Sequence, residues 1–285
     1  MGNIQKVIII GAPRSGTNIL RDVLTSFDGM CTWPCDEINY IWRHGNAKHP
    51  SDELLASNAT PHIKQFINKA FRDIADRYSA DLVVEKTCAN SLRVPFVDAV
   101  LPDAKYIFIY RDGIDAIGSA KERWAARIDL PYIFEKVKFV PKIDLPHYAI
   151  RYFWARIYRL ISKERRLSFW GPSLNEMQSL LKNHSLNEVC ALQWQACVEK
   201  AEHDFSFIAA DRVVRIRYED FVKEPVVEIS RILKFLGREQ KIYVVRKAVK
   251  GVSPCSIGKG RVKLGDKEVR NLEMLVGRTL KHYGY

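Results

Sequence analysis

A glycine-rich segment near the start of the chain has the residue types of an anion-binding loop. Gly11-Ala-Pro-Arg-Ser-Gly-Thr-Asn18 directly follows the apolar run Val7–Ile10. Its two glycines let the backbone turn sharply, so that consecutive N–H groups and the start of a following helix can face a phosphate or sulfate. The glycine spacing matches a P-loop, but Thr17-Asn18 stands where a nucleotide kinase carries lysine followed by serine or threonine. We therefore expect an anion site in which Arg14 supplies the charge. The alternative is a tight structural turn, which rarely needs Arg, Ser and Thr beside two glycines.

A second group of cationic and hydroxyl side chains follows a later apolar run. Arg111 stands at the expected carboxyl end of a strand, where parallel sheets bind ligands. Ser119 and Arg123 are four residues apart, so they share one face of the next helix. These three side chains could bind a second phosphate through charge-assisted hydrogen bonds. The alternative is a surface helix in which Arg123 pairs with Asp115 or Glu122.

Short apolar runs alternate with amphipathic stretches along most of the chain. The runs predict strands over Val7–Ile10, Leu82–Glu85, Lys105–Tyr110 and Val214–Arg217. The stretches predict helices over Asn18–Phe27, His62–Tyr78, Arg93–Val100, Ile114–Arg127 and Glu188–Phe205. This alternation predicts an α/β protein with a P-loop-like three-layer fold, a central parallel sheet flanked by helices. Residues 1–285 then form a single domain, with a helical insertion at about 127–187 as a wall or lid of the site.

Composition narrows the classes of partner. The 285 residues include 45 Lys and Arg against 33 Asp and Glu, which gives a net charge of +12. That surplus favours an anionic partner, whether nucleic acid, a membrane surface or a small molecule bearing phosphate or sulfate. No apolar run is long enough to span a membrane, and six cysteines without a C-x-x-C pair are typical of a reduced, cytoplasmic protein. The seven histidines lack metal-ligand spacing, so we expect no metal site.

Taken together, the two groups resemble the sulfotransferases that use 3′-phosphoadenosine 5′-phosphosulfate (PAPS). The motifs are most similar to those of the tyrosylprotein sulfotransferases and related bacterial enzymes. Pro13–Thr17 resembles their 5′-phosphosulfate loop, and Arg111 with Ser119 resembles their 3′-phosphate motif. Further segments match in the same order: Glu85-Lys86-Thr87, Arg111-Asp112-Gly113, Arg123, Tyr218–Val222 with Pro225, and the tail Ser253–Lys267. The resemblance covers most of the chain except about 127–187.

The resemblance implies a donor site and a set of catalytic groups. The residues that would bind PAPS, and its product 3′,5′-adenosine bisphosphate (PAP), are Arg14, Ser15, Gly16, Thr17, Asn18, Arg111, Ser119, Arg123, Tyr218, Lys259, Gly260, Arg261 and Lys267. A hydroxyl or amine acceptor would attack in line, with Glu37 as the general base. Lys86 and Arg14 would stabilise the developing charge, and Ser253 resembles the family's transition-state serine.

Several points stay open at this stage. Asp36 competes with Glu37 for the role of base, because the spacing from the loop is slightly longer than in the family. Ser256 is an alternative to Ser253, three residues further along the tail. The acceptor could be a peptide tyrosine, a glycan, a lipid or a small metabolite, and the oligomeric state is unknown.

Two other functions compete with sulfuryl transfer. A P-loop kinase or NTPase would need magnesium and the lysine that Thr17 replaces. A nucleic-acid-binding or membrane-surface protein would need its cations in one exposed stripe, whereas the best-placed cations here stand at strand ends and glycine loops, so we expect no nucleic-acid partner. The basic, aromatic-rich stretch Tyr148–Arg166 could contact a membrane or a lipid-like acceptor, or it could be an ordinary domain helix.

Overall fold

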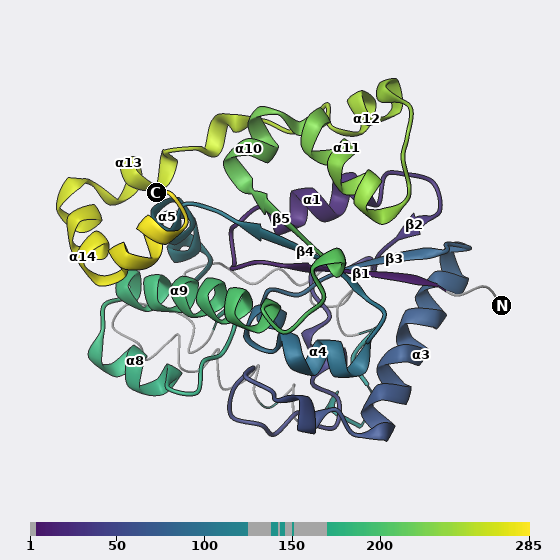
Figure 1. The fold of residues 1–285 in the computed structure, drawn as a ribbon. Coiled ribbons are helices and arrows are strands. Elements are labelled where there is room, and N and C mark those ends of the chain that lie inside the picture. Colours follow the sequence, from purple (N-terminus) through teal and green to yellow (C-terminus); the bar gives the residue numbers. More distant parts are fainter. Residues whose placement is uncertain (1–3, 125–137, 142, 146–149, 151–169) are drawn as a thin grey trace.

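A parallel β-sheet lies at the centre of the molecule (Figure 1). The computed structural model describes residues 4–124, 138–141, 143–145, 150 and 170–285, with the backbone alone at 121–123. Within these ranges the sheet has five strands in the order β2-β3-β1-β4-β5. The strands are β1 (Gln5–Ile10), β2 (Met30–Cys31), β3 (Leu82–Lys86), β4 (Lys105–Tyr110) and β5 (Val213–Arg217). The predicted α/β class, with a parallel central sheet, is confirmed.

Helices cover both faces of the sheet, as Figure 1 shows. One face carries α1 (Thr17–Leu24), α10 (Tyr218–Lys223) and α11 (Pro225–Leu236), with α12 (Ile242–Ala248) beyond them. The other carries α3 (Pro61–Tyr78), α4 (Val94–Val100) and α9 (Leu186–Phe205). The remaining elements are α2 (Asn39–Trp42), α5 (Gly113–Trp124), α8 (Met177–Asn183), α13 (Lys259–Leu264), α14 (Asp266–His282) and the 3₁₀ turns η1 (Ala56–Asn58), η2 (Cys88–Leu92), η3 (Ala210–Arg212) and η4 (Pro254–Ser256).

The apolar sequence of β1 follows from this layering. Successive side chains of a strand point to opposite faces, so a strand covered on both faces is apolar throughout. Val7 and Ile9 pack in the core layer that holds α1 and α11. Ile8 and Ile10 pack in the layer that holds α3, α4 and α9. All four side chains are fully buried, and the strand delivers the glycine-rich loop to the carboxyl edge of the sheet.

The structure departs from the predicted elements at several boundaries. The predicted helix Asn18–Phe27 begins one residue earlier and ends at Leu24. The two-residue strand β2 was missed, because two residues carry no periodic signal. The tail expected as one loop up to Lys267 instead contains η4 and α13, and Lys267 itself lies in the first turn of α14.

The predicted insertion at about 127–187 is described only in part. Its helix α8 lies within the described ranges and packs beside α9. The stretch Tyr148–Arg166, predicted as a basic aromatic helix, lies outside the described residues except for Ile150. Among the helices that the structure describes, none combines the length and the apolar character needed to cross a membrane.

Candidate functional site

The glycine-rich loop turns directly into the amino end of α1. Two of its residues, Arg14 at φ 69° and Gly16 at φ 86°, have left-handed backbone conformations. A Cβ atom at Gly16 would lie 2.3 Å from the ring of Tyr218, so this position requires glycine for both conformation and space. Ser15 is fully buried, and its hydroxyl has no hydrogen-bond partner among the described residues. No side chain caps α1, which leaves its first N–H groups and this hydroxyl for an anion.

The loop and the second predicted group are in direct contact. The Nε of Arg14 donates a hydrogen bond to the hydroxyl of Ser119 at 2.9 Å. Arg111 donates from Nη1 to the Arg14 carbonyl at 3.0 Å, and its guanidinium lies 4.4 Å from the centre of the Tyr218 ring. Its Nε is buried without a partner in the described part of the chain. Two arginines, a serine and a tyrosine therefore meet beside the loop, as the predicted donor site requires.

The tail docks against the start of α5. The backbone N–H groups of Gly258 and Gly260 both donate to the carboxylate of Asp115, at 2.6 and 2.7 Å. A Cβ at Gly260 would lie 2.4 Å from the Cα of Asp115, so only glycine allows the approach of α13 to α5. Asp115 is thus engaged by the backbone of the tail. The side chain of Arg123 lies outside the described set.

Ser256, rather than Ser253, lies beside Arg111 and Tyr218. The hydroxyls of Ser256 and Tyr218 are 2.6 Å apart, and the Ser256 carbonyl accepts from Nη2 of Arg111 at 2.8 Å. Ser253 is exposed, and its hydroxyl donates to the sulfur of Cys255 at 2.9 Å. The assignment of Ser253 as a catalytic residue therefore gains no support from its position.

The three predicted tail cations, Lys259, Arg261 and Lys267, do not lie together at one site. Arg261 is half-buried and forms ion pairs with Asp112 at 3.4 Å and Glu273 at 2.7 Å. Lys259 and Lys267 are exposed at the starts of α13 and α14. Arg261 thus fixes the tail to the body of the protein, while the two lysines lie on its surface.

The candidate base lies on a segment, Asp36–Asn39, that crosses the carboxyl end of β3; we call it the base segment. The Nζ of Lys86 is 3.0 Å from Oε1 of Glu37 and 3.0 Å from Oδ1 of Asp36. Glu37 also accepts from the backbone N–H of Cys88 at 3.2 Å. Asn18, in the first turn of α1, donates to Asp36 at 2.6 Å. The structure therefore places both rival carboxylates on one lysine next to the glycine-rich loop.

The two carboxylates beside Lys86 keep its ammonium group charged. Its side chain is 1% exposed, and burial alone lowers the pKa of a lysine. The negative charges of Glu37 and Asp36 more than offset that effect, and the pKa of Lys86 is raised above its usual value. At neutral pH Lys86 is therefore a cation, able to stabilise negative charge at the mouth of the loop.

A network of buried charged and amide side chains underlies the base segment, and the sequence reading missed it. Arg93 donates to the Asn39 amide oxygen at 2.5 Å and lies 3.4 Å from Asp52. Arg43 pairs with the same carboxylate at 2.9 Å. Burial raises the pKa of Asp52, but the two arginines outweigh it and bring that pKa below its usual value. These residues are far apart in the sequence, so no local pattern marks them.

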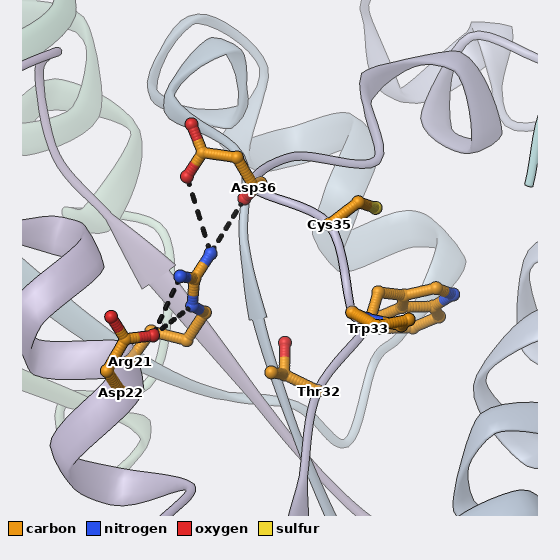
Figure 2. A pocket seen from close by; sticks show the side chains of 7 residues that line it. Arg21, Asp22, Thr32, Trp33, Cys35 and Asp36 are labelled. Atoms are coloured by element: carbon orange, nitrogen blue, oxygen red, sulfur yellow. Dashed lines mark hydrogen bonds and ion pairs between the residues drawn. The ribbon is translucent and has the colours of Figure 1, made fainter. Parts of the chain in front are cut away.

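A groove of about 450 Å³ opens between α1 and the chain that leads to the base segment (Figure 2). It is lined by Arg21, Asp22 and the run from Thr32 to Asp36. Arg21 donates to the Asp36 carbonyl at 2.9 Å and forms an ion pair with Asp22 at 2.7 Å. One of the lining residues, Asp36, also contacts Lys86. Among the described residues, no cluster of His, Cys, Asp or Glu is suited to a metal ion.

Comparison with known proteins identifies the family. A model of the sulfotransferase family matches residues 6–167 and 157–241 of this chain. The chain belongs to the sulfotransferase family. The matched residues include the glycine-rich loop, the base segment, Lys86, Arg111 and Tyr218. No curated protein is significantly similar to this sulfotransferase in sequence.

Solved structures share the fold of this sulfotransferase. The sulfotransferase domain from the olefin synthase of Synechococcus PCC 7002 has a TM-score of 0.56 at 14% identity, over 100% of this chain and 96% of that domain. Sulfotransferase STF9 from Mycobacterium avium has a TM-score of 0.55 at 11% identity, over 100% of this chain and 78% of that one. The sulfotransferase domain from the curacin biosynthetic pathway reaches 0.52 at 15% identity, over 89% and 83%. The predicted P-loop-like fold with a parallel sheet is thereby confirmed.

Proposed function

We propose that this protein transfers a sulfuryl group from PAPS to a hydroxyl or amine acceptor, with Glu37 as the general base. One observation carries the proposal. The Lys86 ammonium lies within 3.0 Å of the Glu37 carboxylate, on the strand next to the one that ends in the glycine-rich loop. A cation and a base at the mouth of an anion loop are the groups that this reaction needs.

The residues of the donor end suit a nucleotide with two anionic groups. Ser15, the backbone of the loop and the amino end of α1 would hold the 5′-phosphosulfate. Arg111 and Ser119 would hold the 3′-phosphate through charge-assisted hydrogen bonds. The unpartnered buried Ser15 hydroxyl and Arg111 Nε support this fit, because buried polar atoms normally have partners. Tyr218, next to Arg111 and Gly16, offers a ring and a hydroxyl to the nucleoside.

The reaction would proceed as an in-line displacement at sulfur. The acceptor oxygen forms the new S–O bond while Glu37 takes its proton, and the bond between sulfur and the bridging oxygen of the 5′-phosphate breaks. Negative charge develops on that bridging oxygen as PAP leaves. Lys86 and Arg14 would stabilise this charge, and positioning supplies most of the remaining rate enhancement. No metal takes part in this scheme.

The acceptor would approach from the side of the base segment. The groove of Figure 2 is lined in part by Asp36, one residue from Glu37, and supports this route. The acceptor itself is proposed only as a molecule that bears a hydroxyl or an amine.

Ligand binding without metal separates the proposal from its rivals. We expect PAP, titrated calorimetrically in the presence of EDTA, to bind in the micromolar range or tighter and to raise the melting temperature. Clear stabilisation by ATP–Mg²⁺ with none by PAP would contradict the proposed donor and favour a kinase or NTPase.

A further inference from the structure

Glu85 is a buried carboxyl group in β3 that the proposed reaction does not use. Its side chain is 1% exposed, and its register partner in β1 is Ile8, within an otherwise apolar part of the sheet. A buried charge at such a position is costly unless hydrogen bonds compensate it. The hydrogen-bond partners of Glu85 therefore indicate why a carboxyl group is present.

The partners of Glu85 connect it to the base segment. Its Oε1 accepts from the Thr87 hydroxyl at 2.5 Å, and its Oε2 accepts from the Asn90 amide at 3.0 Å. A threonine hydroxyl has one hydrogen to donate and two lone pairs. Because the Thr87 hydrogen goes to Glu85, its oxygen faces the backbone N–H of Ile38 as an acceptor, at 3.3 Å. Ile38 directly follows Glu37 in the base segment.

The base segment is thus held from both faces of β3. Successive side chains of a strand alternate between faces, so Glu85 shares the face of Val83 and Lys86 shares the face of Val84. Val83 packs in the layer of α3, α4 and α9, and Val84 in the layer of α1 and α11. Lys86 holds the Glu37 carboxylate on one side, and Thr87 holds the backbone behind it on the other.

We propose that Glu85 and Thr87 are a positioning pair for the base. Glu85 orients the Thr87 hydroxyl, Thr87 fixes the backbone of Ile38, and the Glu37 side chain is thereby kept beside Lys86 in the direction of the acceptor. Neither Glu85 nor Thr87 touches the reacting atoms. This inference rests on the proposed role of Glu37.

Matched substitutions within one segment test the pair. Thr87→Val removes the hydroxyl at nearly constant volume, whereas Thr87→Ser keeps it. Ser91→Ala is the control, because Ser91 is fully buried in the same segment and its hydroxyl donates to the Cys88 carbonyl at 2.8 Å rather than to Glu85 or to the base segment itself. For Thr87→Val we expect kcat to fall by about ten- to a hundredfold, the cost of an unsatisfied buried N–H, with the Kd for PAP unchanged within about twofold. Thr87→Ser and Ser91→Ala should retain the wild-type kcat within about threefold.

Glu85→Gln tests the other member of the pair. Glutamine replaces one of the two carboxylate oxygens with an NH₂ group that only donates, so one of the hydrogen bonds from Thr87 and Asn90 loses its acceptor atom. We expect kcat to fall by about tenfold, again with PAP affinity retained. Hydrogen exchange of the Ile38 amide gives a readout that does not depend on activity. The amide should exchange faster in both Thr87→Val and Glu85→Gln than in the wild type and in Ser91→Ala.

The outcomes separate this inference from the proposed function. If Glu37→Gln is inactive while Thr87→Val and Glu85→Gln keep the wild-type kcat and Ile38 exchange rate, the positioning pair is wrong and the base assignment stands. An equal loss of kcat in Ser91→Ala and Thr87→Val would also overturn the pair, because it would reflect general weakening of the segment. If Glu37→Gln itself turns over normally, the proposed base is wrong, and the pair loses its role with it.

Discussion

The donor end and the base segment of this sulfotransferase are built in different ways. The donor end depends on backbone turns and close glycine contacts, such as Gly16 beneath Tyr218 and Gly260 against α5. The base segment depends on buried ionisable side chains, among them Lys86 and Glu85, supplied by β3 and the turn after it. One region obtains its shape from main-chain conformation and the other from a polar network. We therefore expect the two functions, donor binding and proton removal, to be separable by mutation.

The largest separation should come from the base itself. Glu37→Gln removes the proton acceptor but keeps a side chain that can face Lys86. We expect turnover to fall by about 10² to 10⁴, the usual contribution of a general base, with the Kd for PAP unchanged within a few-fold. Asp36→Asn is the matched control on the neighbouring carboxylate, measured with the same steady-state assay. Turnover that survives in Glu37→Gln and disappears in Asp36→Asn would assign the base to Asp36.

The base segment should also carry a pH dependence of stability through Glu85. Burial raises the pKa of Glu85 to about 7 from a usual value of 4.5, despite the lowering effect of the Thr87 hydrogen bond. The nearby charge of Glu37 raises this pKa further, and that of Lys86 lowers it. The folded state therefore holds this proton more tightly than the unfolded chain does. The resulting stability is fully present below pH 4.5 and is lost as the pH rises to 7, by up to about 3 kcal/mol at about 1.4 kcal/mol per pH unit.

Comparison with Glu85→Gln isolates this contribution. The variant has no titrating group at the site, so its free energy of unfolding should fall less than that of the wild type between pH 5 and pH 8. Urea denaturation at a series of pH values measures the difference. Parallel curves for the two proteins would show that Glu85 does not titrate in this range.

At the donor end the cations should control nucleotide affinity. We expect Arg14→Ala and Arg111→Ala each to weaken PAP binding by about 1.5–3 kcal/mol, if each makes one charge-assisted hydrogen bond. Calorimetry at fixed ionic strength gives the values, and Glu37→Gln is the variant in which affinity should stay constant. Unchanged affinity in both arginine variants would remove the donor-site assignment.

The difference between glycine turns at the donor end and a buried polar network at the base segment also explains what could be predicted from the sequence. The glycine-rich loop, Arg111 and Ser119 were predictable because strand ends and glycine spacings are local patterns, and the structure brings them together as expected. The parallel sheet followed from apolar runs such as Val7–Ile10 for the same reason. The short strand β2 and the start of α14 were not predictable, because neither carries a periodic signal of its own.

Around the base segment, only Glu37, Asp36 and Lys86 were predicted from the sequence, and the buried residues that support them were not. Glu37 and Lys86 were found through resemblance to the family, but their contact joins residues 49 positions apart. The hydrogen bond between Thr87 and Ile38 and the pairing of Asp52 with Arg43 and Arg93 depend on burial, which a sequence does not mark for charged residues. In the tail, resemblance to the family favoured Ser253 with Ser256 as the alternative, and it is Ser256 that contacts Arg111.

The smallest effect should come from a single hydroxyl at the donor end. Tyr218→Phe keeps the ring against Gly16 and loses the contact with the Ser256 hydroxyl, so we expect PAP affinity to fall by about 1 kcal/mol. Tyr283→Phe is the control, because its hydroxyl donates to the Val198 carbonyl at 3.1 Å, in α9. Isothermal calorimetry should show an effect of the first substitution alone. An equal change in both variants would point to a general loss of stability.

The central claim, sulfuryl transfer from PAPS with Glu37 as the base, is tested most directly with sulfur-labelled donor. The wild-type protein and Glu37→Gln are incubated with labelled PAPS, EDTA and a panel of hydroxyl and amine acceptors that includes tyrosyl peptides, glycans, lipids and small metabolites. We predict labelled product and stoichiometric PAP with at least one acceptor class for the wild type, and none for Glu37→Gln, although both proteins bind PAP. Failure of the wild type to bind PAP or to transfer label, together with hydrolysis of ATP–Mg²⁺, would contradict the claim.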